Sequence, residues 1–219
     1  MILIYTHSIT PRVSYTMDLV FNTLLNSSYQ LTDDPQFYRS SVLPKLAYTI
    51  YHDELECLME ADGLLFESTL RKQVSEASGE YLNFPVFFNT SQKSFLPYDV
   101  FATVFYFASR YEEYLPSELD MHQRFQAENS QAFKHGFLNK PFLNYLVDDL
   151  AQKLKQKYPA LEFKKRNFNF LSTIDIDNAF AYAHKGFKRN LGGLLKDLAS
   201  FKWRDVVRRL AANTNSLKD

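Results

Sequence analysis

Short apolar segments of the strand type alternate with segments of helical periodicity along the first 157 residues, and this alternation constrains the fold more than any other feature of the sequence. Strands are predicted at residues 2–5, 29–32, 46–51, 64–66 and 85–88. Helices are predicted at residues 12–26, 99–114 and 141–157, and Asp99 is the expected N-cap of the second one. Strands that alternate with helices are typical of α/β layer architectures, although periodicity does not give the order of the strands. The sequence therefore predicts an α/β fold.

The composition indicates a packed core and argues against several other classes of protein. The 219 residues include 20 Phe and 14 Tyr but only 6 Gly, which argues against disorder and against a loop-rich disulfide scaffold. Cys57 is the single cysteine, so an intramolecular disulfide and a cysteine-based zinc site are both excluded. Apolar neighbours predict that the Cys57 thiol is buried and unreactive.

The charge and hydropathy of the chain bear on its partners and its location. The formal net charge is zero, which gives the whole molecule no electrostatic footprint for nucleic acid. No apolar run approaches the roughly 18 to 20 residues that span a bilayer, and no signal peptide follows Met1. We therefore expect a soluble cytoplasmic protein that binds no nucleic acid and has no transmembrane segment.

A domain boundary is predicted near residues 160–167, which separates an α/β domain at 1–165 from a second segment at 166–219. Residues 185–219 carry nine Lys and Arg against three Asp, together with apolar residues at helical spacing. Such helices could contact an anionic membrane or a polysaccharide, but the preferred interpretation is a helical insertion whose apolar face packs against protein. If it is exposed, that face favours a homo-oligomer formed through the C-terminal helices.

Two acidic residues follow an apolar run and form the candidate with the clearest chemistry. Asp175 and Asp177 lie two residues apart in a strand predicted at 168–177, so their side chains should point to the same side of it. A metal cation relieves the repulsion between two such carboxylates and leaves one of them able to act as a base. The pattern also fits a cap on a helix at 179–183, a haloacid-dehalogenase-like phosphatase or a glycosyltransferase.

The stretch from Ser172 to Tyr182 resembles the opening motif of polysaccharide deacetylases, in an Asp-x-Asp variant. The preceding part of the chain resembles the uncharacterised N-terminal domain that is joined to such barrels in a group of Bacteroidetes proteins. The matching stretches are residues 1–5, 9–12, 99–105, 109–114, 120–125 and 136–141. The resemblance implies an N-terminal α/β domain of mixed layers, followed by the first strand and helices of an incomplete (β/α) barrel.

The same resemblance implies roles for individual residues. Asp175 would be the general base and Asp177 a metal ligand, with Thr173 and Asn178 as supporting residues. The cofactor would be Zn²⁺ or a similar divalent ion, and the substrate an N-acetylated polysaccharide. The family's metal site also needs a pair of histidines about one helical turn apart, which the five scattered histidines do not form. We therefore expect the chain by itself to be inactive.

The N-terminal domain offers a second candidate site. Arg110, Glu112 and Glu113 lie at the end of a predicted helix and could form a polar site. The preferred interpretation is that Arg110 is the partner in a structural ion pair and that the two Glu lie on a solvated or docking face. Asp120, His122 and Arg124 alternate in a polar segment and could line a pocket, although a single loop histidine is more often structural. The alternative to the enzyme hypothesis is that residues 1–165 form a non-catalytic module that binds a glycan or a protein.

Overall fold

The computed structural model describes all residues except 52–53, 72–75, 164–166, 176–185 and 214–219. The chain divides into two compact units, Met1–Arg166 and Asn167–Asp219, and each is described by itself below. In the part of the chain that is described, no helix is both long enough and apolar enough to cross a membrane.

A four-stranded parallel sheet forms the centre of the first unit, which confirms the α/β fold class. Its strands are β1 (Ile2–Thr6), β2 (Tyr29–Thr32), β3 (Lys45–Thr49) and β4 (Leu58–Glu60). They lie in the order β2-β1-β3-β4, and every neighbouring pair is parallel. The strands predicted at residues 2–5, 29–32 and 46–51 correspond to β1, β2 and β3.

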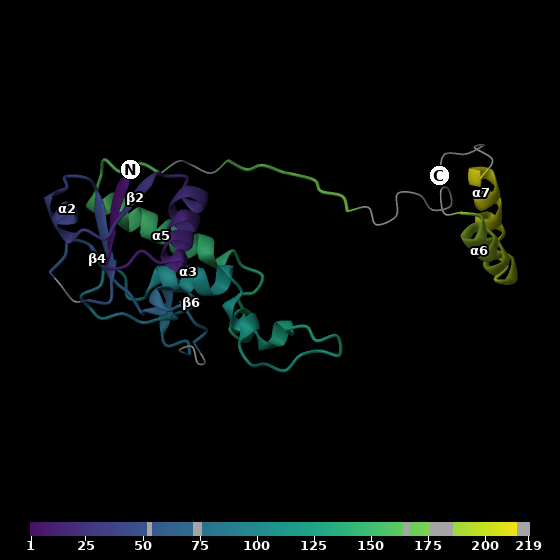
Figure 1. Ribbon diagram of the computed structural model, residues 1–219, viewed down its shortest axis with the longest axis horizontal. Coiled ribbons are helices and arrows are strands. Elements are labelled where there is room, and N and C mark those ends of the chain that lie inside the picture. The colour runs from purple at the N-terminus through teal and green to yellow at the C-terminus, as the bar shows by residue number, and fades with distance from the viewer. Residues whose placement is uncertain (52–53, 72–75, 164–166, 176–185, 214–219) are drawn as a thin grey trace. The chain divides into compact units, whose positions relative to one another are not determined.

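Both faces of the sheet are buried, and the alternation of side chains along the strands divides the core in two. Ile2 and Ile4 belong to the larger core, which also contains residues of α1 (Pro11–Met17), α3 (Val100–Ala108) and α5 (Phe142–Lys157). Leu3 and Tyr5 point to the other face, where Tyr38 of α2 (Pro35–Ser40) covers them. Figure 1 shows α2 on one side of the sheet and α1, α3 and α5 on the other.

The three predicted helices are present, with different ends. α1 starts at Pro11 after the N-cap Thr10 and continues as the π-helical segment η1 (Asp18–Leu24). α3 starts after the N-cap Asp99 as predicted, but it stops at Ala108. It stops early because Arg110 has a φ of 53°, a left-handed conformation that ends a helix, and the 3₁₀ turn η3 (Tyr111–Tyr114) follows.

Two of the predicted strands are wrong or shorter than expected. Leu64–Phe66 forms the 3₁₀ turn η2, because Gly63 has a φ of 107° and its carbonyl accepts a hydrogen bond from the amide of Phe66. This turn buries Leu64 and Leu65 without any strand partner. The strand predicted at residues 85–88 is reduced to β6 (Phe84–Pro85), which pairs with β5 (Glu80–Tyr81).

The segment between η3 and α5 contains η4 (Ala127–Asn129) and α4 (Gln131–Lys134). Tilted and edge-to-face contacts between aromatic rings attach it to the core. Phe137 lies 4.5 Å from Phe142 and 5.6 Å from Phe107, measured between ring centroids.

Cys57 is buried, as predicted, and burial raises the pKa of its thiol to about 12.

The second unit contains the helices α6 (Phe187–Ala199) and α7 (Trp203–Asn213). The strand predicted at residues 168–177 is wrong for residues 168–175, which have no strand structure and are exposed. A strand needs a neighbour to satisfy its backbone hydrogen bonds, and none of the described residues of this segment is paired with one. Residues 176 and 177 lie outside the described residues.

Candidate functional site

A cavity of about 320 Å³ lies at the C-terminal end of α3 and contains part of the predicted N-terminal site. We call it the Glu112 pocket. It is lined by Tyr106, Phe107, Arg110, Glu112, Glu113, Phe125, Ala127, Ser130, Ala132 and Leu138. Arg110 is 74% exposed and forms an ion pair with Glu113. The left-handed backbone of Arg110 turns the chain so that Glu112 faces the pocket.

Glu112 is the half-buried carboxyl group of this pocket. Its Oε2 accepts a hydrogen bond from the backbone amide of Gln131 at 3.0 Å and a longer one from the Tyr106 hydroxyl at 3.3 Å. Burial raises the pKa of the Glu112 carboxyl, and the hydrogen bond from Gln131 partly offsets this effect. The pocket therefore contains an acidic group with fixed orientation between aromatic walls.

Asp120, His122 and Arg124 do not line the Glu112 pocket but form a tight turn next to it. The Asp120 carboxylate accepts hydrogen bonds from the amides of His122 (2.8 Å) and Arg124 (2.9 Å), and from the Arg124 guanidinium (2.9 Å). These bonds lower the pKa of Asp120, the Arg124 side chain contributing most. The turn ends in a bridge between Leu119 and Phe125, and Phe125 lines the pocket. The three residues thus hold the loop that supplies one pocket wall.

The sequence analysis considered Glu112 only as part of a possible polar site at the end of a helix, and it did not identify Tyr106. Glu112 was expected, like Glu113, on a solvated or docking face. Its amide partner Gln131 lies 19 residues further along the chain, at the start of α4, whose N-cap is Ser130. Helical spacing reports only neighbours three or four residues apart, so it gives no signal for this contact.

Ligands of open α/β sheets bind at the carboxyl edge of the sheet, at the point where the strand order reverses. In this sheet that point lies between β1 and β3. His7 follows β1, and its Nδ1 lies 3.0 Å from Oγ1 of Thr49 at the end of β3. The His7 ring packs against the Phe66 ring, with 4.0 Å between the ring centroids, and burial lowers the pKa of the His7 imidazole. Arg71 pairs with both Asp62 and Glu67 beside this edge. These side chains are thus bonded to one another at the edge.

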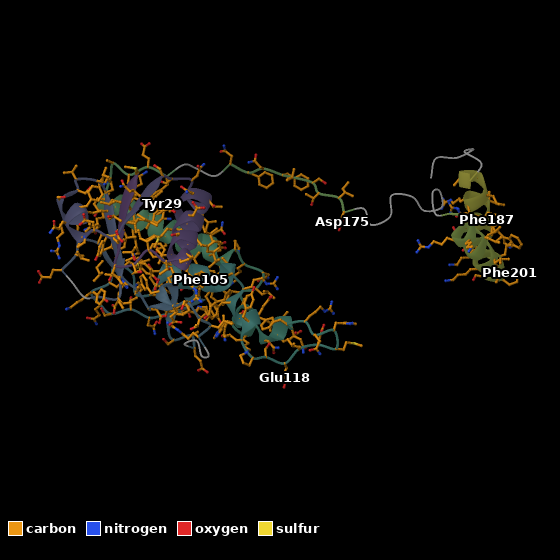
Figure 2. The ribbon with its side chains drawn as sticks, in the orientation of Figure 1. Tyr29, Phe105, Glu118, Asp175, Phe187 and Phe201 are labelled. Atoms are coloured by element: carbon orange, nitrogen blue, oxygen red, sulfur yellow. The ribbon has the colours of Figure 1, made fainter. Side chains whose placement is uncertain are left out.

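The acidic motif is described only in part. Thr173 and Asp175 lie in the exposed, extended stretch that Figure 2 labels at Asp175, while Asp177 and Asn178 lie outside the described residues. Within the described ranges there is no group of three His, Cys, Asp or Glu side chains that could hold a metal ion. The residues that the structure describes therefore do not supply a complete metal site.

Comparison with known proteins identifies the first unit. No curated protein and no solved structure matches the chain. A family of unknown function (DUF7033) matches residues 2–159, which include the whole sheet, α1 to α5 and the Glu112 pocket. The chain belongs to this family of unknown function.

Proposed function

We propose that the chain is the N-terminal part of a metal-dependent polysaccharide deacetylase, in which residues 1–166 form an accessory domain that binds a glycan. The Glu112 pocket is the observation that carries the glycan-binding part. The deacetylase part rests on the resemblance of Ser172–Tyr182 to the opening motif of that enzyme family.

The walls and polar groups of the Glu112 pocket suit a sugar ring. Phe107 and Phe125, which are both partly exposed, offer apolar surface of the kind that packs against the C–H face of a pyranose. Glu112 has oxygen lone pairs left to accept hydrogen bonds from hydroxyl groups, and Arg110 and Glu113 add a donor and an acceptor at the rim. A volume of about 320 Å³ is at the lower end of the usual range for small-ligand sites.

Glu112→Gln should weaken the binding of a soluble oligosaccharide of N-acetylglucosamine by about tenfold, because a charged hydrogen-bond acceptor contributes roughly 1.5 to 3 kcal/mol, part of which the amide retains. Isothermal titration calorimetry on the whole chain measures the change. Gln has nearly the same shape as Glu, so its side-chain oxygen can still accept the bond from Gln131.

Glu118→Gln is the matched control, since Glu118 is exposed in the same segment and does not line the pocket (Figure 2). The Glu118→Gln variant should bind the oligosaccharide with the affinity of the wild type. Equal affinities of the Glu112→Gln variant and the wild type would contradict the assignment of the glycan to this pocket.

The proposed catalytic role of Asp175 is that of a general base, which takes a proton from the attacking water. In this enzyme class a divalent ion such as Zn²⁺ polarises the N-acetyl group and acidifies that water. Asp177 would be a ligand of the ion, and Thr173 and Asn178 would support the motif. The remaining ligands would come from a pair of histidines encoded beyond Asp219.

Asp175→Asn should lower acetate release by at least about 100-fold in the product of the complete reading frame, because a positioned general base contributes roughly 10²- to 10⁴-fold. Asp33→Asn, at an exposed position in the first unit, should leave the rate unchanged. The assay uses an N-acetylated oligosaccharide with added Zn²⁺, Co²⁺ or Ni²⁺, and residues 1–219 alone should release no acetate. A stop codon directly after Asp219, or full activity of the Asp175→Asn product, would refute the deacetylase proposal.

A further inference from the structure

The helices α6 and α7 form a hairpin whose inner side is fixed by specific contacts. Arg209 donates to Oδ2 of Asp197 from Nε at 3.0 Å and from Nη2 at 2.8 Å, and both side chains are largely buried. The guanidinium of Arg209 lies against Gly193, where a Cβ atom would come within 2.5 Å of it. Val206 is buried as well. These residues therefore define the side on which the two helices contact each other.

A second side of the hairpin is apolar and exposed. We call it the apolar face, and it consists of Phe187, Leu191, Leu195, Leu198, Phe201, Trp203 and Val207. Phe187, Leu191, Leu195 and Leu198 recur three or four positions apart along α6, Trp203 and Val207 are four positions apart on α7, and Phe201 lies between the two helices. Figure 2 shows the side chains of the labelled Phe187 and Phe201 on this hairpin. Trp203 and Val207 are both 62% exposed.

The polar surface of the hairpin is strongly basic. Residues 186–213 contain seven Lys and Arg against two Asp, a net charge of +5. Because Asp197 pairs with Arg209 inside the hairpin, the other six basic residues have Asp205 as the single opposing carboxylate of this segment. The exposed basic side chains belong to Lys188, Arg189, Lys196, Lys202, Arg204 and Arg208.

We propose that the α6–α7 hairpin lies in the surface of a membrane that contains anionic phospholipids. An amphipathic helix with Phe, Trp and Leu on one side and Lys and Arg on the other has the composition of an interfacial helix. Its apolar face enters the boundary between headgroups and acyl chains, while each basic residue near the surface contributes about 1 kcal/mol of attraction to anionic lipids.

Charge complementarity favours the membrane over a second copy of the chain and over an anionic polysaccharide. A second copy would bring two hairpins of charge +5 together, and their repulsion would oppose burial of the apolar face. An anionic polysaccharide would neutralise the basic residues but would leave the Phe, Leu and Trp side chains in water. An anionic bilayer buries the apolar face in its acyl region and neutralises the basic residues with its headgroups.

The experiment uses Trp203, which is the single tryptophan of the chain, so its fluorescence reports on this surface alone. Vesicles of phosphatidylglycerol and phosphatidylcholine should shift the emission to shorter wavelength and sediment the protein. Vesicles of phosphatidylcholine alone should bind the protein at least about tenfold more weakly. Addition of 0.5 M salt should weaken binding to the anionic vesicles by a similar factor, because salt screens the attraction. Equal binding to both vesicle types would overturn the proposal.

Val207→Asp and Val42→Asp provide a matched pair, because Val42 is also exposed (98%) but lies in the first unit. Binding to the anionic vesicles should fall at least about tenfold for Val207→Asp and stay unchanged for Val42→Asp. Arg204→Glu tests the charge independently of the apolar face and should also weaken binding. Unchanged binding of Val207→Asp, or a concentration-dependent dimer with blue-shifted Trp203 in the absence of lipid, would exclude the membrane as the occupant.

Discussion

Asp99→Ala should lower the free energy of unfolding of the first unit by about 4 kcal/mol, through the loss of an N-cap and of the acceptor for buried donors. The Asp99 carboxylate is fully buried and accepts hydrogen bonds from the amide of Ala102 (2.9 Å), the hydroxyl of Tyr48 (2.9 Å) and the amide of Asp62 (2.8 Å). It therefore joins the start of α3 to β3 and to the residues that follow β4. Urea unfolding followed by circular dichroism measures the loss.

Asp34→Ala is the control, because Asp34 has the same capping role at an exposed helix start. Its carboxylate accepts bonds from the amides of Gln36 and Phe37 at the start of α2. Since water can replace these bonds, the expected cost is about 1 kcal/mol. If the two alanine variants lose the same stability, the buried contacts of Asp99 add nothing to its role as a cap.

The sign of the pH dependence of Asp99 follows from its burial. Burial raises the pKa of the carboxyl to about 7, although the hydrogen bonds from Ala102, Asp62 and Tyr48 act in the opposite direction. In the unfolded chain this pKa is about 4. Between these values the folded state holds a proton that the unfolded state has released, so stability falls as pH rises through this window. The wild type should therefore lose more stability between pH 5 and pH 7.5 than Asp99→Asn.

The elements predicted correctly are those that local patterns determine. Ile2–Tyr5 is apolar throughout because both faces of β1 are buried, and the periodicity of α3 and α5 reports one buried side of each helix. Asp99 was predicted as an N-cap from its position before an apolar helical run. Its contacts with Tyr48 and Asp62 could not be predicted, since those residues lie 51 and 37 positions away.

The predictions that the structure contradicts concern pairing over long distances. Leu64–Phe66 and residues 168–175 have strand-like composition, but composition is the same whether or not a neighbouring strand is present. In the candidate site, the pair Arg110 and Glu113 lies within one helical turn, whereas Glu112 is defined by its contact with the distant Gln131. A pocket made by two distant segments leaves no periodic signal in either of them.

Phe142→Ala should lower the free energy of unfolding of the first unit by about 3 to 5 kcal/mol, the usual cost of emptying a buried aromatic site. The Phe142 ring lies 4.5 Å from Phe137, 5.1 Å from Phe84 and 5.2 Å from Phe107, measured between centroids. Without Phe142, each of these three rings loses one aromatic contact, at the point where α3, α5 and the segment before α5 meet. Urea unfolding again measures the change.

Phe168→Ala makes the same chemical change at a side chain that is 92% exposed, so it should cost less than about 0.5 kcal/mol. Phe107 lines the Glu112 pocket and Phe137 precedes Leu138, which also lines it. Loss of Phe142 should therefore weaken oligosaccharide binding as well, even under conditions in which the variant is fully folded. A folded Phe142→Ala protein with wild-type affinity would mean that the pocket does not depend on the aromatic cluster beneath it.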